Sequence, residues 1–288
     1  MIEALLADPA AATAAAFVLG LLVGSFLNVV ILRLPRRLEW QWRQDSREQL
    51  ELPESYEPAP PGIAVESSHC PHCGHKLSWF ENIPLLSFAV LRGKCRACGA
   101  RISWQYPFVE LLTGLLFAAC AWRFGAGITG ALAMFFSASL VALSGIDLRT
   151  TLLPDVLTQP LLWVGLLASL VTVFVDPVQA ILGAAAGYLF LWIVYWVFKL
   201  VTGKEGMGAG DFKLLAALGA WCGVTSLLGI LLLSSLVGAL VGGAWLLARG
   251  KDRSTQIPFG PYLAIAGWLQ FYYQFDVLRL VLRLTAPA

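Results

Sequence analysis

The sequence predicts an all-α polytopic membrane protein with about eight transmembrane helices and a small cytoplasmic insert after the first of them. The first observation is composition: of 288 residues, 58% are hydrophobic and 13% are charged, whereas soluble domains have about 25% charged residues. The second is a series of long apolar runs, which can cross a bilayer as helices because a helix satisfies its own backbone hydrogen bonds. The third is a charged stretch over residues 33–104, which separates one apolar run from the others.

The first 33 residues contain the first expected transmembrane helix. Its apolar run covers residues 11–32 and leads into "LNVVILRLP", which lacks the small-residue cleavage site of a secretory signal peptide. We therefore expect residues 1–33 to remain as a membrane helix. Further apolar runs lie near residues 106–122, 128–146, 156–175, 178–198, 225–248 and 259–282.

The stretch after Lys213 is too long for one ordinary crossing. It contains 35 residues before the next charge, Arg249, and would measure about 52 Å as one helix. The segment "GAWCGVTS" (219–226) offers a break, which gives a short helix over 212–222 and a full one over 225–248. With eight crossings and the N-terminus outside, 17 of the 20 Lys and Arg residues lie on the inner side, in agreement with the positive-inside rule. A single crossing would place the last two basic clusters on opposite sides.

Two aspartates fall on the same membrane face in this topology. Asp147 ends the apolar stretch "FFSASLVALSGID", and Asp211 precedes the short crossing. That crossing measures only about 16 Å, so its start should lie within the bilayer and carry Asp211 below the headgroups. An ionisable residue at such a depth is costly and indicates a functional site.

A carboxylate pair at this position admits three interpretations. In an aspartic protease, one ionised carboxylate activates water while its protonated partner supports the developing oxyanion. The pair could equally be a proton or cation relay in a transporter, or each acid could have a local structural role. The glycines before Asp211 leave room for an extended peptide or for positive φ angles, which favours a functional role for this residue. They are Gly206, Gly208 and Gly210.

The histidine inventory excludes two other hydrolytic mechanisms. The three histidines, His69, His72 and His75, all flank cysteines, so none is available to a serine within the membrane. The zinc-protease motif H-E-x-x-H is missing from the sequence. Other charged residues near the aspartates have simpler interpretations: Asp155 resembles a helix N-cap, and Lys213 is expected to extend its ammonium group to the headgroups.

Residues 34–105 form the only sizeable segment expected outside the membrane, a cytoplasmic domain. Two C-x2-C pairs, each followed by glycine, are typical of a zinc ribbon, in which four thiolates hold a structural Zn²⁺. A catalytic or redox role is the alternative. The charged, proline-rich residues 37–66 predict a solvated helix that runs into a flexible linker. The candidate metal ligands are Cys70, Cys73, Cys95 and Cys98.

Small and polar residues also indicate how the first helix packs and where a later helix begins. Gly24, Ser25 and Asn28 are spaced along the first expected helix, where they predict close helix packing and a hydrogen bond between helices. The segment "PFGP" (258–261) indicates a break at which a later helix begins.

Together these motifs resemble the bacterial type IV prepilin peptidases, a family of bifunctional leader peptidases and N-methyltransferases. The matching segments occur in the family's order and cover nearly the whole chain outside residues 37–66 and the extreme termini. They are "GSFLNVVILRLP" (24–35), "NIPLLSF" (82–88), "RGKCRACGARISWQYPFVE" (92–110), "IDLRTTLLPDVLT" (146–158), "EGMGAGDFKLLAALGAW" (205–221) and "PFGPYLA" (258–264).

The resemblance implies an intramembrane aspartic protease of the G-x-G-D type, with Asp147 and Asp211 as the catalytic pair in a transmembrane core over residues 106–288. It implies type IV prepilins and type II secretion pseudopilins as substrates. The reactions would be hydrolysis after the leader's terminal glycine and methylation of the new N-terminal amine by S-adenosylmethionine. The resemblance also implies a multi-pass protein in the lipid bilayer of the bacterial inner membrane, where the topology expected from the Lys and Arg distribution gives periplasmic termini and an active site that faces the cytoplasm. The residues that bind the methyl donor are unknown, and we expect no nucleic-acid partner.

Two other classes of protein remain open at this point. One is an ion-coupled transporter regulated by a zinc ribbon, and the other is a non-enzymatic scaffold for pilin assembly. Transporters typically contain matched pairs of broken helices, but no second glycine-interrupted segment matches residues 205–222. Cleavage of a prepilin by the purified protein would separate the enzyme from both alternatives.

Overall fold

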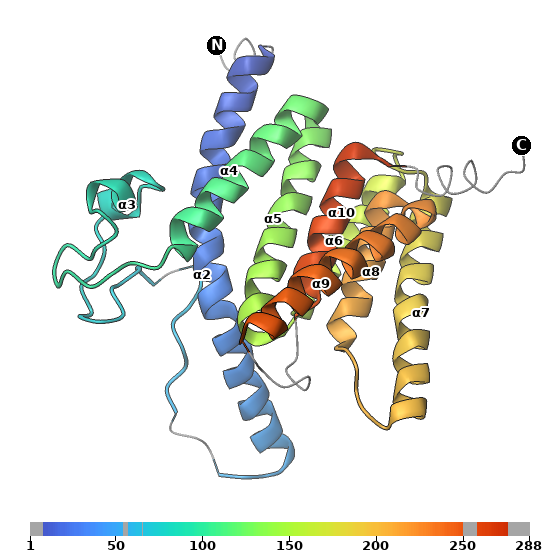
Figure 1. Cartoon of the computed structure of the whole chain (residues 1–288). Coiled ribbons are helices and arrows are strands. Elements are labelled where there is room, and N and C mark those ends of the chain that lie inside the picture. Colours follow the sequence, from blue (N-terminus) through green and yellow to red (C-terminus); the bar gives the residue numbers. More distant parts are fainter. Residues whose placement is uncertain (1–7, 54–56, 65, 250–257, 276–288) are drawn as a thin grey trace, which may run out of the picture. The chain divides into compact units, whose positions relative to one another are not determined.

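The computed structural model describes residues 8–53, 57–64, 66–249 and 258–275. Within these ranges the regular elements are all helices (Figure 1), and β-structure is limited to two isolated bridges, His69–Lys76 and Lys94–Arg101. The expected all-α fold is therefore confirmed. The elements in chain order are α2 (Pro9–Gln49), η1 (Trp79–Asn82), α3 (Leu86–Val90), α4 (Gln105–Phe124), α5 (Ile128–Thr150), α6 (Asp155–Ser169), α7 (Pro177–Thr202), α8 (Ala209–Cys222), η2 (Val224–Ser226), α9 (Leu227–Arg249) and α10 (Gly260–Tyr273).

A helix lies in each apolar segment expected to cross the membrane. Five of these segments are long and apolar enough to do so: α2, α4, α5, α7 and the stretch Val224–Gly242, which covers η2 and most of α9. The other three helices, α6, α8 and α10, have 15, 14 and 14 residues. They measure about 21–22 Å against a hydrocarbon core of about 30 Å. The chain is thus a multi-pass membrane protein, while eight crossings remain a prediction.

The break expected within residues 219–226 is confirmed. α8 ends at Cys222, and Gly223 follows with a φ of 81°, a left-handed conformation that favours glycine. Two later boundaries differ from the expected ones. α6 ends at Ser169, short of the expected 175, because the chain turns before α7. α10 ends at Tyr273, and residues 276–282 of the expected run lie outside the described residues.

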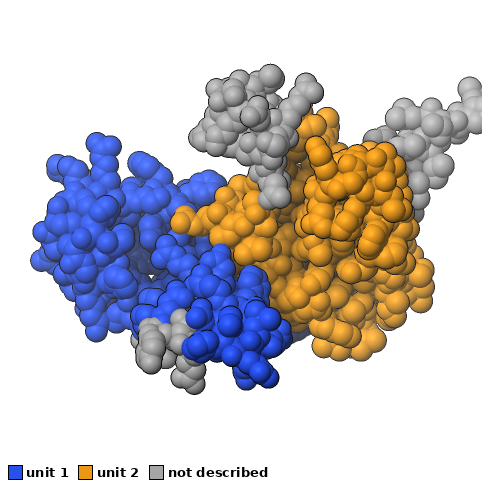
Figure 2. All heavy atoms as spheres, turned by 90° about the horizontal axis from the view of Figure 1, so that it is seen from below, with its two compact units in different colours: residues 1–142 blue, residues 143–288 orange. Residues whose placement is uncertain are grey.

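The chain divides into two compact units, residues 1–142 and 143–288, which Figure 2 shows in blue and orange. The boundary falls within α5, so the last turns of this helix belong to the second unit. The division expected from the sequence, with an insert over 34–105 and a core over 106–288, is a different one and remains a prediction.

In the first unit, α2 packs closely along α4 (Figure 1). A Cβ atom on Gly24 would lie only 2.7 Å from the Cα atom of Glu110, so glycine is what permits the two backbones to approach. Asn28 is buried and donates its side-chain amide to the carbonyl oxygen of Tyr106 at 3.1 Å. Both expectations for the first helix, close packing and a hydrogen bond between helices, are confirmed.

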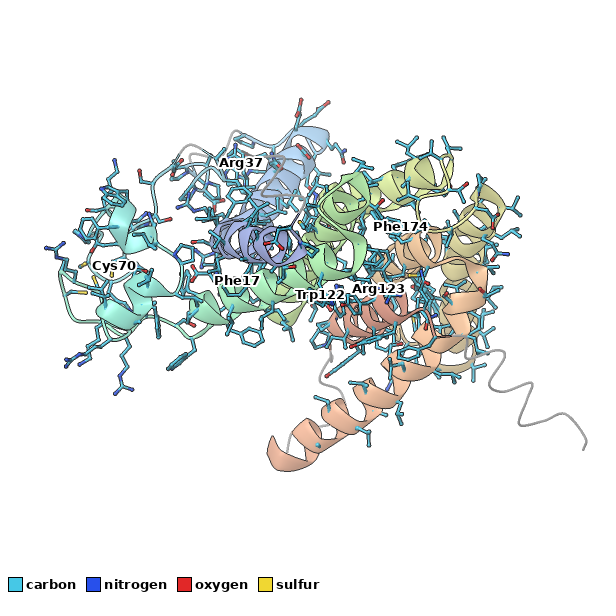
Figure 3. The ribbon with its side chains drawn as sticks, turned by 90° about the horizontal axis from the view of Figure 1, so that it is seen from above. Phe17, Arg37, Cys70, Trp122, Arg123 and Phe174 are labelled. Atoms are coloured by element: carbon cyan, nitrogen blue, oxygen red, sulfur yellow. The ribbon has the colours of Figure 1, made fainter. Side chains whose placement is uncertain are left out.

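The helix α2 continues without interruption beyond its apolar part, and the chain that follows folds back onto it. Arg33 donates to the carbonyl oxygen of Gly62 at 2.7 Å, and Arg37, labelled in Figure 3, donates to that of Pro60 at 3.5 Å. Arginine presents several N–H donors in a fixed geometry, which suits the carbonyl groups of an extended segment. The expectation of a flexible linker is therefore wrong for residues 57–64, which dock on α2.

In the second unit, α8 is a central helix that packs against α6, α7 and α10. Its last turn is anchored by Trp221, whose indole N–H donates to the carbonyl oxygen of Leu161 at 2.8 Å. The Trp221 ring also packs against Phe174, labelled in Figure 3, and Phe271, with ring centroids 5.6 and 6.0 Å apart. This anchoring fixes α8 in the unit and thereby positions Asp211 at its start.

Candidate active site

Both predicted catalytic aspartates are buried in the second unit. Asp147 lies in the last turn of α5 with 4% of its surface exposed, and Asp211 lies in the first turn of α8 with 7% exposed. The position of Asp211 suits a carboxylate, because the N-terminus of a helix carries partial positive charge. The position of Asp147 does not, because the C-terminus of a helix carries partial negative charge. Helix electrostatics therefore cannot account for an acid at residue 147.

The N-terminus of α10 provides the missing stabilisation. The backbone N–H of Gly260, the first residue of α10, donates to Oδ2 of Asp147 at 2.9 Å. This N–H is one of the groups that have no partner within the helix, so it is free to bind an anion. A Cβ atom on Gly260 would lie 2.7 Å from the same oxygen. The "PFGP" segment was expected to begin a helix, which is confirmed, but its contact with Asp147 was missed.

Leu153 connects the starts of α8 and α10. A Cβ atom on Gly210 would lie 2.7 Å from Cβ of Leu153, and one on Gly260 would lie 3.1 Å from its Cδ2. Gly210 directly precedes Asp211, and Gly260 contacts Asp147, so the loop that holds Leu153 draws the two acids to one place. The carboxylates are near enough for the charge on Asp147 to act on Asp211. The structure thus brings the two predicted site residues together.

The glycines before Asp211 allow neighbouring side chains to lie close to the backbone. None of Gly206, Gly208 and Gly210 has a positive φ, so the expectation of left-handed backbone at these positions is wrong. A Cβ atom on Gly206 would lie 2.7 Å from the ring of Phe198, and Gly210 abuts Leu153. At Gly208 an added Cβ would meet only the backbone nitrogen of Gly210, at 4.0 Å. The fold therefore requires two of the three glycines and leaves open space beside the third.

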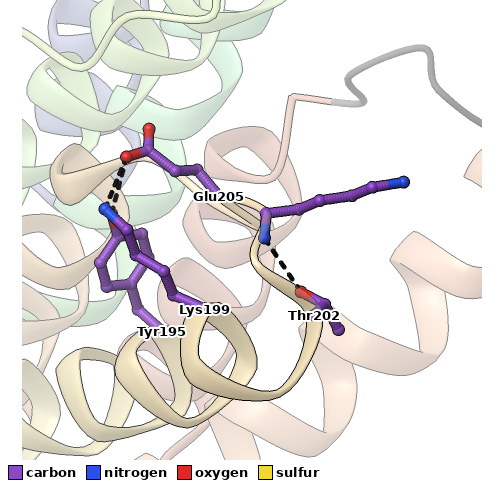
Figure 4. A network of polar contacts seen from close by, with 5 residues as sticks. Tyr195, Lys199, Thr202 and Glu205 are labelled. Carbon is purple, nitrogen blue, oxygen red and sulfur yellow. Dashed lines mark hydrogen bonds and ion pairs between the residues drawn. The ribbon is translucent and has the colours of Figure 1, made fainter.

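The segment between α7 and α8 is held by a polar network (Figure 4). Lys199 donates to Oε1 of Glu205 at 2.8 Å, and the hydroxyl group of Tyr195 donates to the same oxygen at 3.2 Å. These two hydrogen bonds lower the pKa of Glu205. The Tyr195 ring packs against Phe212, with centroids 5.7 Å apart, and Phe212 follows Asp211 in the chain. The network therefore links the glycine-rich segment to the residue beside the carboxylate site.

An ion pair also joins the starts of α6 and α8. Lys213 contacts Asp155 at 2.7 Å from Oδ1 and 2.8 Å from Oδ2. The expectation for Asp155 is therefore wrong: it is the first residue of α6, one position after its N-cap Pro154. Lys213 pairs with it, and its position at the headgroups remains a prediction. The two ends of this pair are partly exposed, so its contribution to stability is about 1 kcal/mol or less. Its role is to hold the 151–154 loop beside Asp211.

The four predicted metal ligands form one cluster in the first unit, and Figure 3 labels Cys70. Their Sγ atoms all lie within 4.8 Å of one another, with Cys70 to Cys98 at 3.9 Å and Cys73 to Cys95 at 4.0 Å. A zinc ion with Zn–S bonds of about 2.3 Å sets tetrahedral sulfurs about 3.8 Å apart, so the cluster fits this metal. Gly74 and Gly99, which follow the pairs, both have a φ of 71°.

The surroundings of Cys70 also suit a thiolate ligand, whereas desolvation and the neighbouring thiols raise the pKa of Cys73 to about 12. The backbone N–H groups of Cys73 and His72 lower the pKa of the Cys70 thiol to about 7, which favours the thiolate form that binds metal. His75 lies apart from this chemistry: its Nε2 atom is 3.2 Å from Oε2 of Glu81. Glu81 also accepts the N–H of Ser78 at 2.8 Å. The expectation that His75 is a flanking residue agrees with this contact.

Fold and sites together define a multi-pass helical membrane protein with a buried carboxylate pair and a separate tetrathiolate cluster. Two family descriptions match the chain: "Bacterial Peptidase A24 N-terminal domain" over residues 18–124 and "Type IV leader peptidase family" over residues 134–243. The chain belongs to the type IV leader peptidase family.

Relatives named "Prepilin leader peptidase/N-methyltransferase" extend this match to nearly the whole chain. The relative from Xanthomonas campestris pv. campestris is 62% identical over 92% of each chain. Those from Aeromonas hydrophila and Pseudomonas aeruginosa are 53% identical over 91% and 48% identical over 98% of each chain. No solved structure matches the chain.

Proposed function

We propose that this protein cleaves the leader peptide of type IV prepilins and methylates the new N-terminal amine. The names of its relatives support both activities, and one observation from the structure carries the peptidase: Asp147 and Asp211 are buried together beside the starts of α8 and α10. Buried acids at such a place are costly unless they serve a function. Pseudopilins of type II secretion are proposed as further substrates on the family resemblance.

In the proposed hydrolysis, the aspartates act as a pair. One ionised carboxylate takes a proton from water as the water attacks the scissile carbonyl, and the protonated partner supports the oxyanion that forms. The carboxyl group that took up this proton then donates it to the leaving nitrogen as the C–N bond breaks, which leaves a carboxyl group on the leader and an amine on the mature protein. Gly260 holds Oδ2 of Asp147 through its N–H, and this contact fixes the orientation of that carboxylate during the reaction.

The second reaction methylates the amine that the first one releases. S-adenosylmethionine is the proposed methyl donor, a co-substrate whose binding residues are unassigned. For Cys70, Cys73, Cys95 and Cys98 we propose a structural zinc ion, because four thiolates complete its tetrahedral shell and leave no open position for catalysis.

The proposed location is the bacterial inner membrane, with eight crossings, the carboxylate site facing the cytoplasm and both termini in the periplasm. The terminal residues 1–7 and 276–288 lie outside the described residues. The distribution of Lys and Arg in the sequence supports this orientation.

The peptidase can be tested with purified protein and a prepilin in detergent. We expect Asp147→Asn and Asp211→Asn each to lower the cleavage rate by at least about 100-fold, since acid–base groups contribute factors of 10²–10⁴. Asp176→Asn is the matched control. Asp176 caps α7 by accepting the N–H groups of Val178 and Gln179, and asparagine caps helices equally well. Substantial cleavage by either of the first two variants would overturn the assignment of the pair.

Mass spectrometry of the mature product, with and without S-adenosylmethionine, tests the second activity. A product heavier by the mass of one methyl group only when the donor is present supports the proposal. A product of unchanged mass under both conditions counts against methylation.

A further inference from the structure

The segment between the two cysteine pairs exposes an apolar face. It consists of Trp79 in η1 and of Leu86 and Val90 in α3, which are 79%, 62% and 75% exposed. We call these three residues the apolar face. In a domain surrounded by water such a concentration of exposed apolar side chains marks an interaction site.

Local structure explains why these residues point outward. Leu86 and Val90 are four positions apart and so share one side of α3. The other side of α3 presents Phe88, whose ring lies 4.9 Å from that of Trp104 and also contacts Gly93. Phe88 is thus the residue that packs the short helix onto its own segment, which leaves Leu86 and Val90 unburied.

The chain that follows the apolar face leads into an exposed stripe on a candidate membrane span. Along α4, which is long and apolar enough to cross a bilayer, Phe108, Leu111 and Leu115 are 64%, 42% and 54% exposed. With Trp104 they are spaced by four, three and four residues, so they lie on one side of the helix. The exposed side of α4 therefore leads directly to Trp104, just before the helix begins. Tryptophan is enriched at the membrane–water interface of membrane proteins.

The charge of the segment fits the same partner. Residues 67–104 contain five basic residues and a single acid, Glu81, which is buried and bound by His75 and Ser78. The guanidinium group of Arg96 lies 5.3 Å from the centre of the Phe80 ring, which brings a positive charge next to Trp79. Basic residues beside an apolar surface favour anionic lipid headgroups. The basic residues are Lys76, Arg92, Lys94, Arg96 and Arg101.

We propose that the apolar face docks on the headgroup layer of the leaflet in which α4 begins. The tetracysteine segment then lies on the membrane surface as a peripheral element, held by Trp79, Leu86 and Val90, instead of standing free in the cytoplasm. A bilayer is favoured over a protein partner because the same segment leads through Trp104 into the exposed stripe of α4 and carries positive charge beside Trp79. This proposal concerns the first unit alone and does not depend on the assignment of Asp147 and Asp211.

The test uses the full-length protein in nanodiscs of phosphatidylethanolamine and phosphatidylglycerol that contain a lipid with a photoreactive group near its headgroup. Without any substrate, we expect mass spectrometry to find lipid adducts on residues 79–104. Trp42, Leu50 and Leu52 serve as the internal control, because they are 47%, 69% and 51% exposed but belong to the far end of the α2 extension. They should remain unlabelled.

A pair of matched variants sharpens the test. Leu86→Glu with Val90→Glu should reduce the adducts on residues 79–104 by at least about fivefold, because charge on the apolar side opposes insertion at the interface. Leu50→Glu with Leu52→Glu should leave them unchanged. Labelling of the wild-type protein stands as evidence on its own if the first variant fails to fold, which gel filtration would show.

Three results would overturn the proposal. One is lipid adducts on the α4 stripe but none on residues 79–104 of the wild-type protein. Another is equal labelling of the apolar face and of the Trp42 control region. The third is a face that shows no lipid adducts but crosslinks to the hydrophobic helix of an added prepilin, which would assign it to the substrate.

Discussion

The contact between Gly260 and Asp147 can be tested by adding a single methyl group. In Gly260→Ala the new Cβ atom would lie 2.7 Å from Oδ2 of Asp147 and 3.1 Å from Cδ2 of Leu153, whereas carbon atoms prefer separations of about 3.5–4.0 Å. The carboxylate must therefore move by about 1 Å. A displacement of this size at a reacting group costs about 100-fold in rate, which corresponds to about 2.7 kcal/mol in the activation free energy.

The fold should survive this change. Extra methyl groups in a packed site cost about 1–3 kcal/mol, and domains have about 5–15 kcal/mol of stability. We therefore expect Gly260→Ala to remain folded and to lose about 100-fold in kcat/KM for prepilin cleavage. Its methylation of an already cleaved substrate should be unchanged, which distinguishes a local effect from unfolding. Gly127→Ala is the control, because an added Cβ there meets no atom within 4 Å.

The reasoning is refuted if Gly260→Ala cleaves prepilin at the wild-type rate. Equal loss of both activities would also refute it, because the damage would then extend beyond the carboxylate.

Two further predictions concern the cysteine cluster and the polar network of Glu205. Cys70→Ser with Cys95→Ser should abolish bound zinc measured by elemental analysis, because two thiolates cannot complete the tetrahedral site; stoichiometric zinc in this variant would place the ligands elsewhere. For Glu205, hydrogen bonds from Lys199 and Tyr195 lower the pKa, so the network is fully formed above the ordinary glutamate pKa of about 4.3 and is lost as pH falls through the lowered value. Hydrogen exchange in residues 203–208, corrected for its intrinsic pH dependence, should therefore increase at acidic pH in the wild-type protein, and Glu205→Gln should lack this step. An identical pH response in both proteins would contradict the role of the network.

Local patterns in the sequence account for most of the helices and for the metal cluster. Apolar runs mark the five helices that are long enough to cross a membrane, and the glycine at residue 223 takes the left-handed conformation that ends α8. The spacing of the two cysteines within each pair is also a local feature. Gly74 and Gly99, which follow the pairs, both have positive φ angles. Such features depend on residues a few positions apart, which the sequence displays directly.

The contacts that build the carboxylate site could not be predicted in this way. Gly260 and Asp147 are 113 positions apart, and Lys213 and Asp155 are 58 apart. Each of these residues also has a plausible local interpretation, as a helix start, a cap or a lysine at the headgroups. The distant contacts form because α6 and α10 pack against α8, and this packing is not visible in the sequence. The "PFGP" segment carried a signal, since glycine between two prolines at a helix start suggests a close approach as well as a turn.

The arrangement of helix ends explains how the second unit tolerates two buried acids. Asp211 benefits from the N-terminus of its own helix, α8, whereas Asp147 lies at the unfavourable end of α5 and receives the N–H of α10 instead. Two positive helix ends therefore meet two carboxylates. Any buried acid needs such provision, whereas an apolar residue at position 147 would need none. These two helix ends suit a site that must keep a carboxylate charged where most water is excluded. Hydrolysis of a peptide bond near a membrane requires such a carboxylate.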